Sequence, residues 1–401
     1  MHRTPKMNCL LFVIALLVIN SVYGQSIIPL IKANSSNVAI NDGGYLEKNA
    51  WSLSPRARPD VYMADRARKP KRVTFYTDID SISVNLKPGA SFDFIILLNG
   101  KDSCYTRIIS SKSVGSPLKQ AQNGHDTIPF ILTKYTAIHV KSIVNNRDTL
   151  NLHFDLGSMD FRLTKSAVLG KTNLLANQPD ALTGKTKPDF NRLEKINTLQ
   201  IGGLIWDNPT VGVANIAAQE MDGRFGWRVF DGKFVEIDYN KSRLIVHARL
   251  PKQRQGYVKS DIKFTQSLFC VEATIKAGGK NYTGDFLFDT GSNLAMILDS
   301  LWMKDQQFPK DLKIMKKLSF SDGAGRQYET SVVSVPTLSL SGFILDMIPT
   351  LLLGSKSPVP SRMNCFGNDL LKRFNVIIDL KNDHIYLKTN DLVGEPYLDR
   401  S

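Results

Sequence analysis

An internal repeat is the feature that most constrains the fold of this 401-residue chain. One copy runs from about residue 125 to 250 and another from about 266 to 388, with four matching blocks in the same order. Each copy opens with two extended segments around a polar turn, and the second segment ends in an acidic tetrapeptide. The tetrapeptides are Asp155-Leu156-Gly157-Ser158 and Asp289-Thr290-Gly291-Ser292. Matched blocks of this kind predict two lobes of one design.

The later blocks repeat too. Phe225-Gly226 precedes a strand-like segment that ends at Asp238, and Phe366-Gly367 precedes, at the same spacing, one that ends at Asp379. Alternating apolar residues around Gly or Asn turns indicate β-hairpins. We therefore predict an all-β, two-lobed fold, with a first lobe over 125–254, a second over 255–395 and a short helix from Asn368 to Arg373.

The first 24 residues have the pattern of a secretory signal. A positive start at His2, Arg3 and Lys6 precedes an apolar run from Leu10 to Ile19, and cleavage after Gly24 fits the small residues that follow. An uncleaved anchor is the alternative, but the apolar run is short for a bilayer span. We expect a secreted or periplasmic protein without an integral membrane segment after cleavage.

Residues 25–124 form an N-terminal extension that divides in two. Up to about residue 70 the composition is polar, which favours a loosely ordered segment. From Arg72 to Ile109 apolar alternation and turn signals predict strands. An extra sheet on the first lobe, a separate small module and a propeptide all remain open.

Part of the net charge of +14 sits in a basic run from Arg56 to Arg72. We expect a solvated linker here, with attachment to an acidic polymer or membrane surface as the alternative. No recognisable nucleic-acid-binding motif accompanies the charge, so no nucleic-acid partner is expected.

Cysteine usage argues against a disulfide scaffold. Cys9 falls in the signal, and Cys104, Cys270 and Cys365 remain, an odd number. One disulfide with a free thiol and three buried thiols are both compatible with this count. The wide spacing argues against a zinc site, so we expect neither metal nor cofactor.

The two aspartates suggest acid–base chemistry. An ionised Asp at the end of an apolar strand is costly unless it is paired, hydrogen-bonded or protonated. If the two copies face each other, Asp155 and Asp289 meet and share one proton. The neutral acid then polarises a carbonyl while the carboxylate activates a water. Each motif's glycine allows close backbone approach, and its serine can hydrogen-bond the carboxylate.

The second motif, with Phe288 before it and Cys365-Phe366-Gly367 later, resembles a lobe of the pepsin and retropepsin families of aspartic proteases. The resemblance covers the 120s to the 380s. It implies a secreted endopeptidase with a peptide or protein substrate bound between two lobes, and Asp155 and Asp289 as catalytic residues. It further implies supporting roles for Gly157, Ser158, Thr290, Gly291 and Ser292, and a flap at Gly323, Ala324 and Gly325, where an ordinary surface turn is the alternative.

One departure weakens the enzymatic interpretation. The family has Thr or Ser where this chain has Leu156, and Leu cannot supply the bracing hydroxyl. We therefore expect Thr290 either to need another acceptor or to be poorly satisfied. A peptide-binding protein that retains the fold without efficient chemistry is the rival hypothesis. The histidines, including His153, show no ligand spacing and are expected to lie on strand surfaces or in packing.

Overall fold

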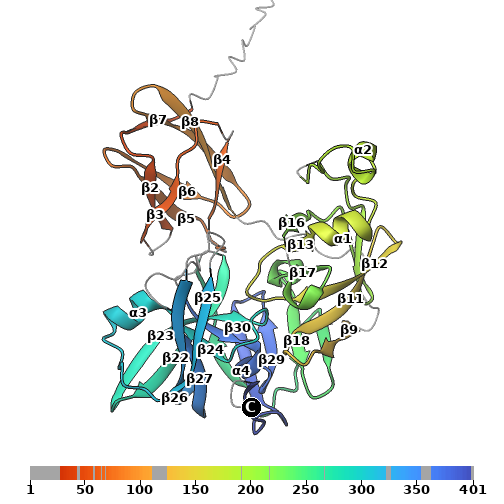
Figure 1. Ribbon diagram of the computed structural model, residues 1–401, viewed down its shortest axis with the longest axis vertical. Coiled ribbons are helices and arrows are strands. Elements are labelled where there is room, and N and C mark those ends of the chain that lie inside the picture. The colour runs from red at the N-terminus through yellow and green to blue at the C-terminus, as the bar shows by residue number, and fades with distance from the viewer. Residues whose placement is uncertain are drawn as a thin grey trace, which may run out of the picture.

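The computed structural model consists of an N-terminal β-sandwich and two larger lobes (Figure 1). The predicted signal, residues 1–24, lies outside the described residues. The structure describes residues 28–42, 46–56, 59–64, 66–67, 69–110, 124–190, 192–215, 217–265, 267–321, 327–353 and 363–398.

Two four-stranded sheets form the N-terminal sandwich, which we define as residues 30–110. In sheet order, the first contains β1 (Leu30–Ala33), β7 (Ser91–Leu98), β8 (Asp102–Ser110) and β4 (Asp60–Ala64). The second contains β3 (Leu46–Ser52), β2 (Asn37–Asp42), β5 (Lys71–Tyr76) and β6 (Ser81–Leu86). Its separate core includes Phe75 and Phe94, whose ring centroids lie 5.2 Å apart.

The expectation of loose order up to about residue 70 is wrong for this sandwich. Four of its strands, β1 to β4, begin before that position. They are short, and buried residues alternate with residues that face water, as in the exposed–buried pattern of β1. The polar composition therefore reflected outward-facing side chains rather than disorder.

The first lobe is built on an eight-stranded sheet. Its β11–β12 hairpin turns through Asn145 and Asn146, both at positive φ, as the polar turn predicted. In sheet order the strands are β15 (Leu204–Asp207), β14 (Thr198–Ile201), β11 (Ile138–Val144), β12 (Asp148–Phe154), β17 (Gly223–Phe225), β13 (Phe161–Thr164) and β16 (Gly212–Ala214), with β10 (Ile131–Leu132) paired to β11. The helices are α1 (Lys165–Gly170), α2 (Pro179–Leu182), η1 (Ala218–Glu220) and η2 (Trp227–Phe230).

The second lobe repeats this plan with its own eight-stranded sheet. Its β22–β23 hairpin turns through Gly278 and Gly279, both at positive φ. The strands are, in sheet order, β21 (Lys263–Thr265), β22 (Leu268–Ala277), β23 (Lys280–Asp289), β28 (Asn364–Gly367), β24 (Met296–Leu298), β27 (Phe343–Leu352), β26 (Gln327–Leu340) and β25 (Ile314–Ser321). The helices are α3 (Ser300–Asp305) and α4 (Asn368–Leu371), and α4 begins where the short helix was predicted.

A six-stranded sheet joins the lobes through the antiparallel pair β18–β29. Its strands, in order, are β20 (Val258–Asp261), β30 (His384–Thr389), β29 (Phe374–Asp379), β18 (Phe234–Asp238), β19 (Arg243–His247) and β9 (His125–Pro129). One continuous apolar core runs through both lobes. The all-β, two-lobed prediction is therefore confirmed.

Arg66 connects the segment between β4 and β5 to both lobes. Its side chain is 7% exposed, and its guanidinium lies 2.7 Å from Asp231 of the first lobe and 3.4 Å from Asp383 of the second. It also lies over the rings of Trp227 and Phe264. The basic run was expected to be a solvated linker, but this member of it is a buried anchor.

Candidate active site

Both aspartates of the repeated motif lie at the ends of buried strands. Asp155 directly follows β12, and Asp289 is the last residue of β23. Each strand runs parallel to a short strand that ends near a glycine, Gly226 after β17 and Gly367 in β28. A Cβ on Gly226 would lie 2.0 Å from a backbone oxygen, and one on Gly367 2.1 Å from another. Both positions therefore require glycine, because the following turn packs directly against the loop after the aspartate.

The two motif loops interlock at the junction of the lobes. A Cβ on Gly157 would lie 2.2 Å from Oδ1 of Asp289, and a Cβ on Gly291 would lie 2.4 Å from Oδ1 of Asp155. The absence of a side chain on each glycine therefore leaves room for the carboxyl group of the other loop. The structure thus brings together Asp155 and Asp289, hereafter the dyad, as the repeat predicted.

Burial and mutual repulsion keep one proton on the dyad. The pKa of Asp289 is raised from 3.8 to about 7, first by burial and then by the negative charge of Asp155. Burial also raises the pKa of Asp155, against opposing contributions from Arg224, from the hydrogen bond with Asp289 and from two backbone amides. Because the two groups interact strongly, the protons leave the pair in two separate steps, and a singly protonated state lies between them.

Thr290 braces the junction across the lobes. Its hydroxyl donates to the carbonyl oxygen of Phe154 at 2.9 Å and accepts from the backbone amide of Leu156 at 2.9 Å. Of the two expected outcomes for Thr290, the first is found: the hydroxyl has another acceptor, the Phe154 carbonyl, and it is not poorly satisfied because the first-lobe backbone supplies both partners. Leu156 itself is fully buried in the apolar core.

His153 makes the return contact, which the sequence analysis did not predict. Its Nε2 lies 3.1 Å from the carbonyl oxygen of Thr290 and must be the donor, because a carbonyl only accepts. Burial lowers the pKa of His153 to about 4, so the ring is neutral above that pH. His153 is thus a buried cross-lobe residue in the lobe where Leu156 provides no hydroxyl.

The motif serines were expected to hydrogen-bond the carboxylates, but the contacts of Ser158 and Ser292 in the structure are to the backbone. The Ser292 hydroxyl accepts from the Leu294 amide at 3.3 Å, and the Ser158 amide donates to the Asp155 carbonyl at 3.1 Å. Backbone amides contact the carboxylates instead, as Gly291 does at 2.8 Å from Oδ1 of Asp289. The carboxyl of Asp289 is thus held by the backbone of its own loop.

The predicted flap residues Gly323, Ala324 and Gly325 lie outside the described residues. The strands on either side, β25 and β26, pair antiparallel up to Ser321 and Gln327. The two strands that flank the predicted flap are therefore paired with each other.

The three cysteines of the described residues, Cys104, Cys270 and Cys365, are buried free thiols. Cys365 lies beside the dyad, with Sγ 3.7 Å from Oδ2 of Asp289, and burial raises its pKa well above 9.0.

Within the described ranges, no group of three or more His, Cys, Asp or Glu side chains could hold a metal ion. No helix in this part of the chain is both long and apolar enough to cross a membrane.

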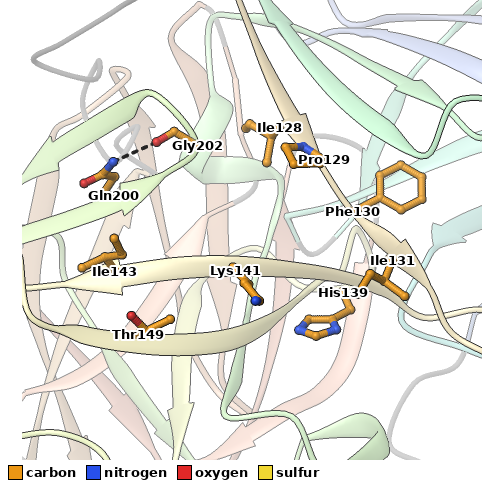
Figure 2. A pocket seen from close by; sticks show the side chains of 10 residues that line it. All are labelled: Ile128, Pro129, Phe130, Ile131, His139, Lys141, Ile143, Thr149, Gln200 and Gly202. Atoms are coloured by element: carbon orange, nitrogen blue, oxygen red, sulfur yellow. Dashed lines mark hydrogen bonds between the residues drawn. The ribbon is translucent and has the colours of Figure 1, made fainter.

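A pocket of about 480 Å³ lies elsewhere, on the first lobe, where Gln200 donates to the carbonyl of Gly202 (Figure 2). Apolar side chains of β9 to β11 and the polar His139, Lys141 and Thr149 line it, and neither aspartate does. It is therefore separate from the dyad.

Two lobes of one β design with a carboxyl pair at their junction define the fold of the pepsin-like aspartic proteases. Among solved structures, the chain is similar to an aspartic proteinase from Irpex lacteus, with 13% identity and a TM-score of 0.44. The alignment covers 68% of this chain and 99% of that enzyme. No family model and no curated protein matches the sequence.

Proposed function

We propose that this chain is an aspartic endopeptidase that hydrolyses peptide bonds through a water activated by Asp155 and Asp289. The observation that carries the proposal is the interlocked pair of loops, in which each carboxyl lies against the other loop's glycine. A singly protonated pair offers a base and an acid at adjacent positions. The cross-lobe contacts of Thr290 and His153 support it by fixing the two loops relative to each other.

The proposed reaction begins with the Asp155 carboxylate as base. It removes a proton from water, whose oxygen forms a bond to the peptide carbonyl carbon, while Asp289 gives its proton to the carbonyl oxygen. The resulting diol returns a hydroxyl proton to Asp289 as the carbon–nitrogen bond breaks. The leaving nitrogen takes the proton held by Asp155, so the dyad ends as it began and one water is consumed.

The test is cleavage of a mixed peptide library by the purified mature chain from pH 3 to pH 8. Asp155→Asn and Asp289→Asn should each abolish cleavage, because each removes one half of the acid–base pair. Asp207→Asn, at an exposed strand end, is the matched control and should leave activity intact.

Absence of cleavage by the folded wild type at every pH would overturn the proposal. Peptides retained on the folded protein without hydrolysis would then support the alternative of a catalytically inactive peptide-binding protein, which Leu156 favours. Cleavage that survives in both Asn variants would show that another site is responsible.

We also propose that the enzyme acts outside the cytoplasm, as a secreted or periplasmic protein. The charged start, the apolar run and the small residues before Gln25 support this location. Mass spectrometry of the exported protein should find a mature N-terminus at Gln25, and a cytoplasmic protein that retains residues 1–24 would contradict it.

A further inference from the structure

The two lobes place different side chains at one equivalent position beside the dyad. Arg224 and Cys365 each lie two residues before the glycine that packs on the motif loop, on strands parallel to those that lead into the aspartates. Nε of Arg224 lies 3.6 Å from Oδ2 of Asp155, and Sγ of Cys365 lies 3.7 Å from Oδ2 of Asp289. The pseudo-twofold symmetry is therefore broken at this point.

The chemical difference between the two side chains is a full charge. A guanidinium stays protonated throughout the pH range of a protein, whereas the buried thiol of Cys365 stays neutral. A positive charge within about 4–6 Å favours the ionised form of a carboxyl group. Arg224 thus stabilises the carboxylate on Asp155, whereas no Lys or Arg side chain of the described residues forms an ion pair with Asp289.

The other groups around the dyad do not offset this difference. His153, from β12, is neutral above about pH 4, and His139 faces it from β11. Burial is also consistent with a specific role for Arg224, since its Nε is buried and donates no hydrogen bond within the described residues. The Asp155 carboxylate is the anion with which it pairs.

We infer that Arg224 is a positioning residue for the dyad, which fixes the negative charge on Asp155 and the shared proton on Asp289. This inference rests on the proposed function, in which the ionised member is the base that activates water. The base and the acid are then assigned to particular lobes by one cation rather than shared equally between two like carboxyl groups.

The test compares Arg224→Met, which removes the charge, with Arg224→Lys, which retains it on a different stem. In the Met variant the acidic limb of the kcat/KM–pH profile should move upward by about one pH unit, because Asp155 becomes harder to ionise. In the Lys variant the acidic limb should move by less than in the Met variant. Arg243→Met is the matched control, because Arg243 is equally exposed and pairs with Asp238 in the central sheet, and its profile should match the wild type.

A second measurement separates this inference from the proposed function. Selective labelling of aspartate with ¹³C at Cγ gives the titration of Asp155 directly, with the resonance assigned by its loss in Asp155→Asn. The Asp155 titration should move upward in Arg224→Met even if no peptide is cleaved. A wild-type chain without activity would overturn the proposed function alone, whereas an unchanged titration of Asp155 in Arg224→Met would overturn the role of Arg224.

Discussion

Replacing Asp289 by Asn should stabilise the folded protein at neutral and alkaline pH. In the folded chain the pKa of Asp289 is raised from 3.8 to about 7, because the carboxyl is buried beside Asp155. In the unfolded chain it ionises near its ordinary pKa, so between these values only the folded state holds the proton. The neutral carboxyl therefore contributes fully to the free energy of unfolding below about pH 4, and this contribution is lost as the pH rises toward 7.

The size of the effect follows from the pKa difference. A displacement from 3.8 to about 7 corresponds to about 4 kcal/mol, at 1.36 kcal/mol for each pKa unit. Asp289 as a whole residue is only partly buried, and contact with water reduces this value. We therefore expect the free energy of unfolding of Asp289→Asn to exceed that of the wild type by on the order of 2 kcal/mol at pH 8. The amide of Asn still offers an oxygen to the backbone N–H of Gly291, which keeps that hydrogen bond.

Urea unfolding followed by tryptophan fluorescence at pH 4.5 and pH 8 would measure the difference. For the wild type, the urea concentration at the unfolding midpoint should be lower at pH 8 than at pH 4.5. For Asp289→Asn, this decrease should be smaller. Asp207→Asn serves again as the control for loss of one exposed carboxylate. Parallel pH curves, or a variant less stable than the wild type at pH 8, would refute the reasoning.

Three contacts give further predictions. Thr290→Val leaves two buried backbone groups without their partner and should cost about 2–4 kcal/mol in unfolding free energy by urea titration; a cost below about 1 kcal/mol would contradict the brace. Gly291→Ala places a methyl group 2.4 Å from Oδ1 of Asp155 and should lower kcat/KM about 100-fold, whereas Gly170→Ala, with nothing within 4 Å, should not; equal activity of the two would count against the interlocked loops. Arg66→Met should speed limited proteolysis between β4 and β5, and unchanged rates would show that the anchor does not restrain the sandwich.

The repeat predicted the lobes and the meeting of the two aspartates because a pseudo-twofold brings equivalent positions together. Symmetry of this kind can be recognised directly from matching sequence segments in the two copies. It could not predict the contacts that break the symmetry. His153 reaches the Thr290 carbonyl 137 residues away, and no local pattern records which residue across the junction it will face.

The first four strands of the N-terminal sandwich were missed for a different reason. These strands are only four to seven residues long, and in β2 the buried Val38 and Ile40 alternate with less buried residues. The average composition of the chain up to about residue 70 does not show this alternation of buried and exposed residues. The alternation itself was the available signal. The buried role of Arg66 carried no such signal, because its partners Asp231 and Asp383 come from two distant turns.

The position of Arg66 has a mechanical consequence. The lobes are joined through the β18–β29 pair, so a hinge motion that opens or closes the space between them pivots about that seam. Asp231 and Asp383 lie on opposite sides of it, and one guanidinium contacts both. Any bending that separates these two carboxylates must break an ion pair, so we expect Arg66 to make opening of the two lobes cost more free energy.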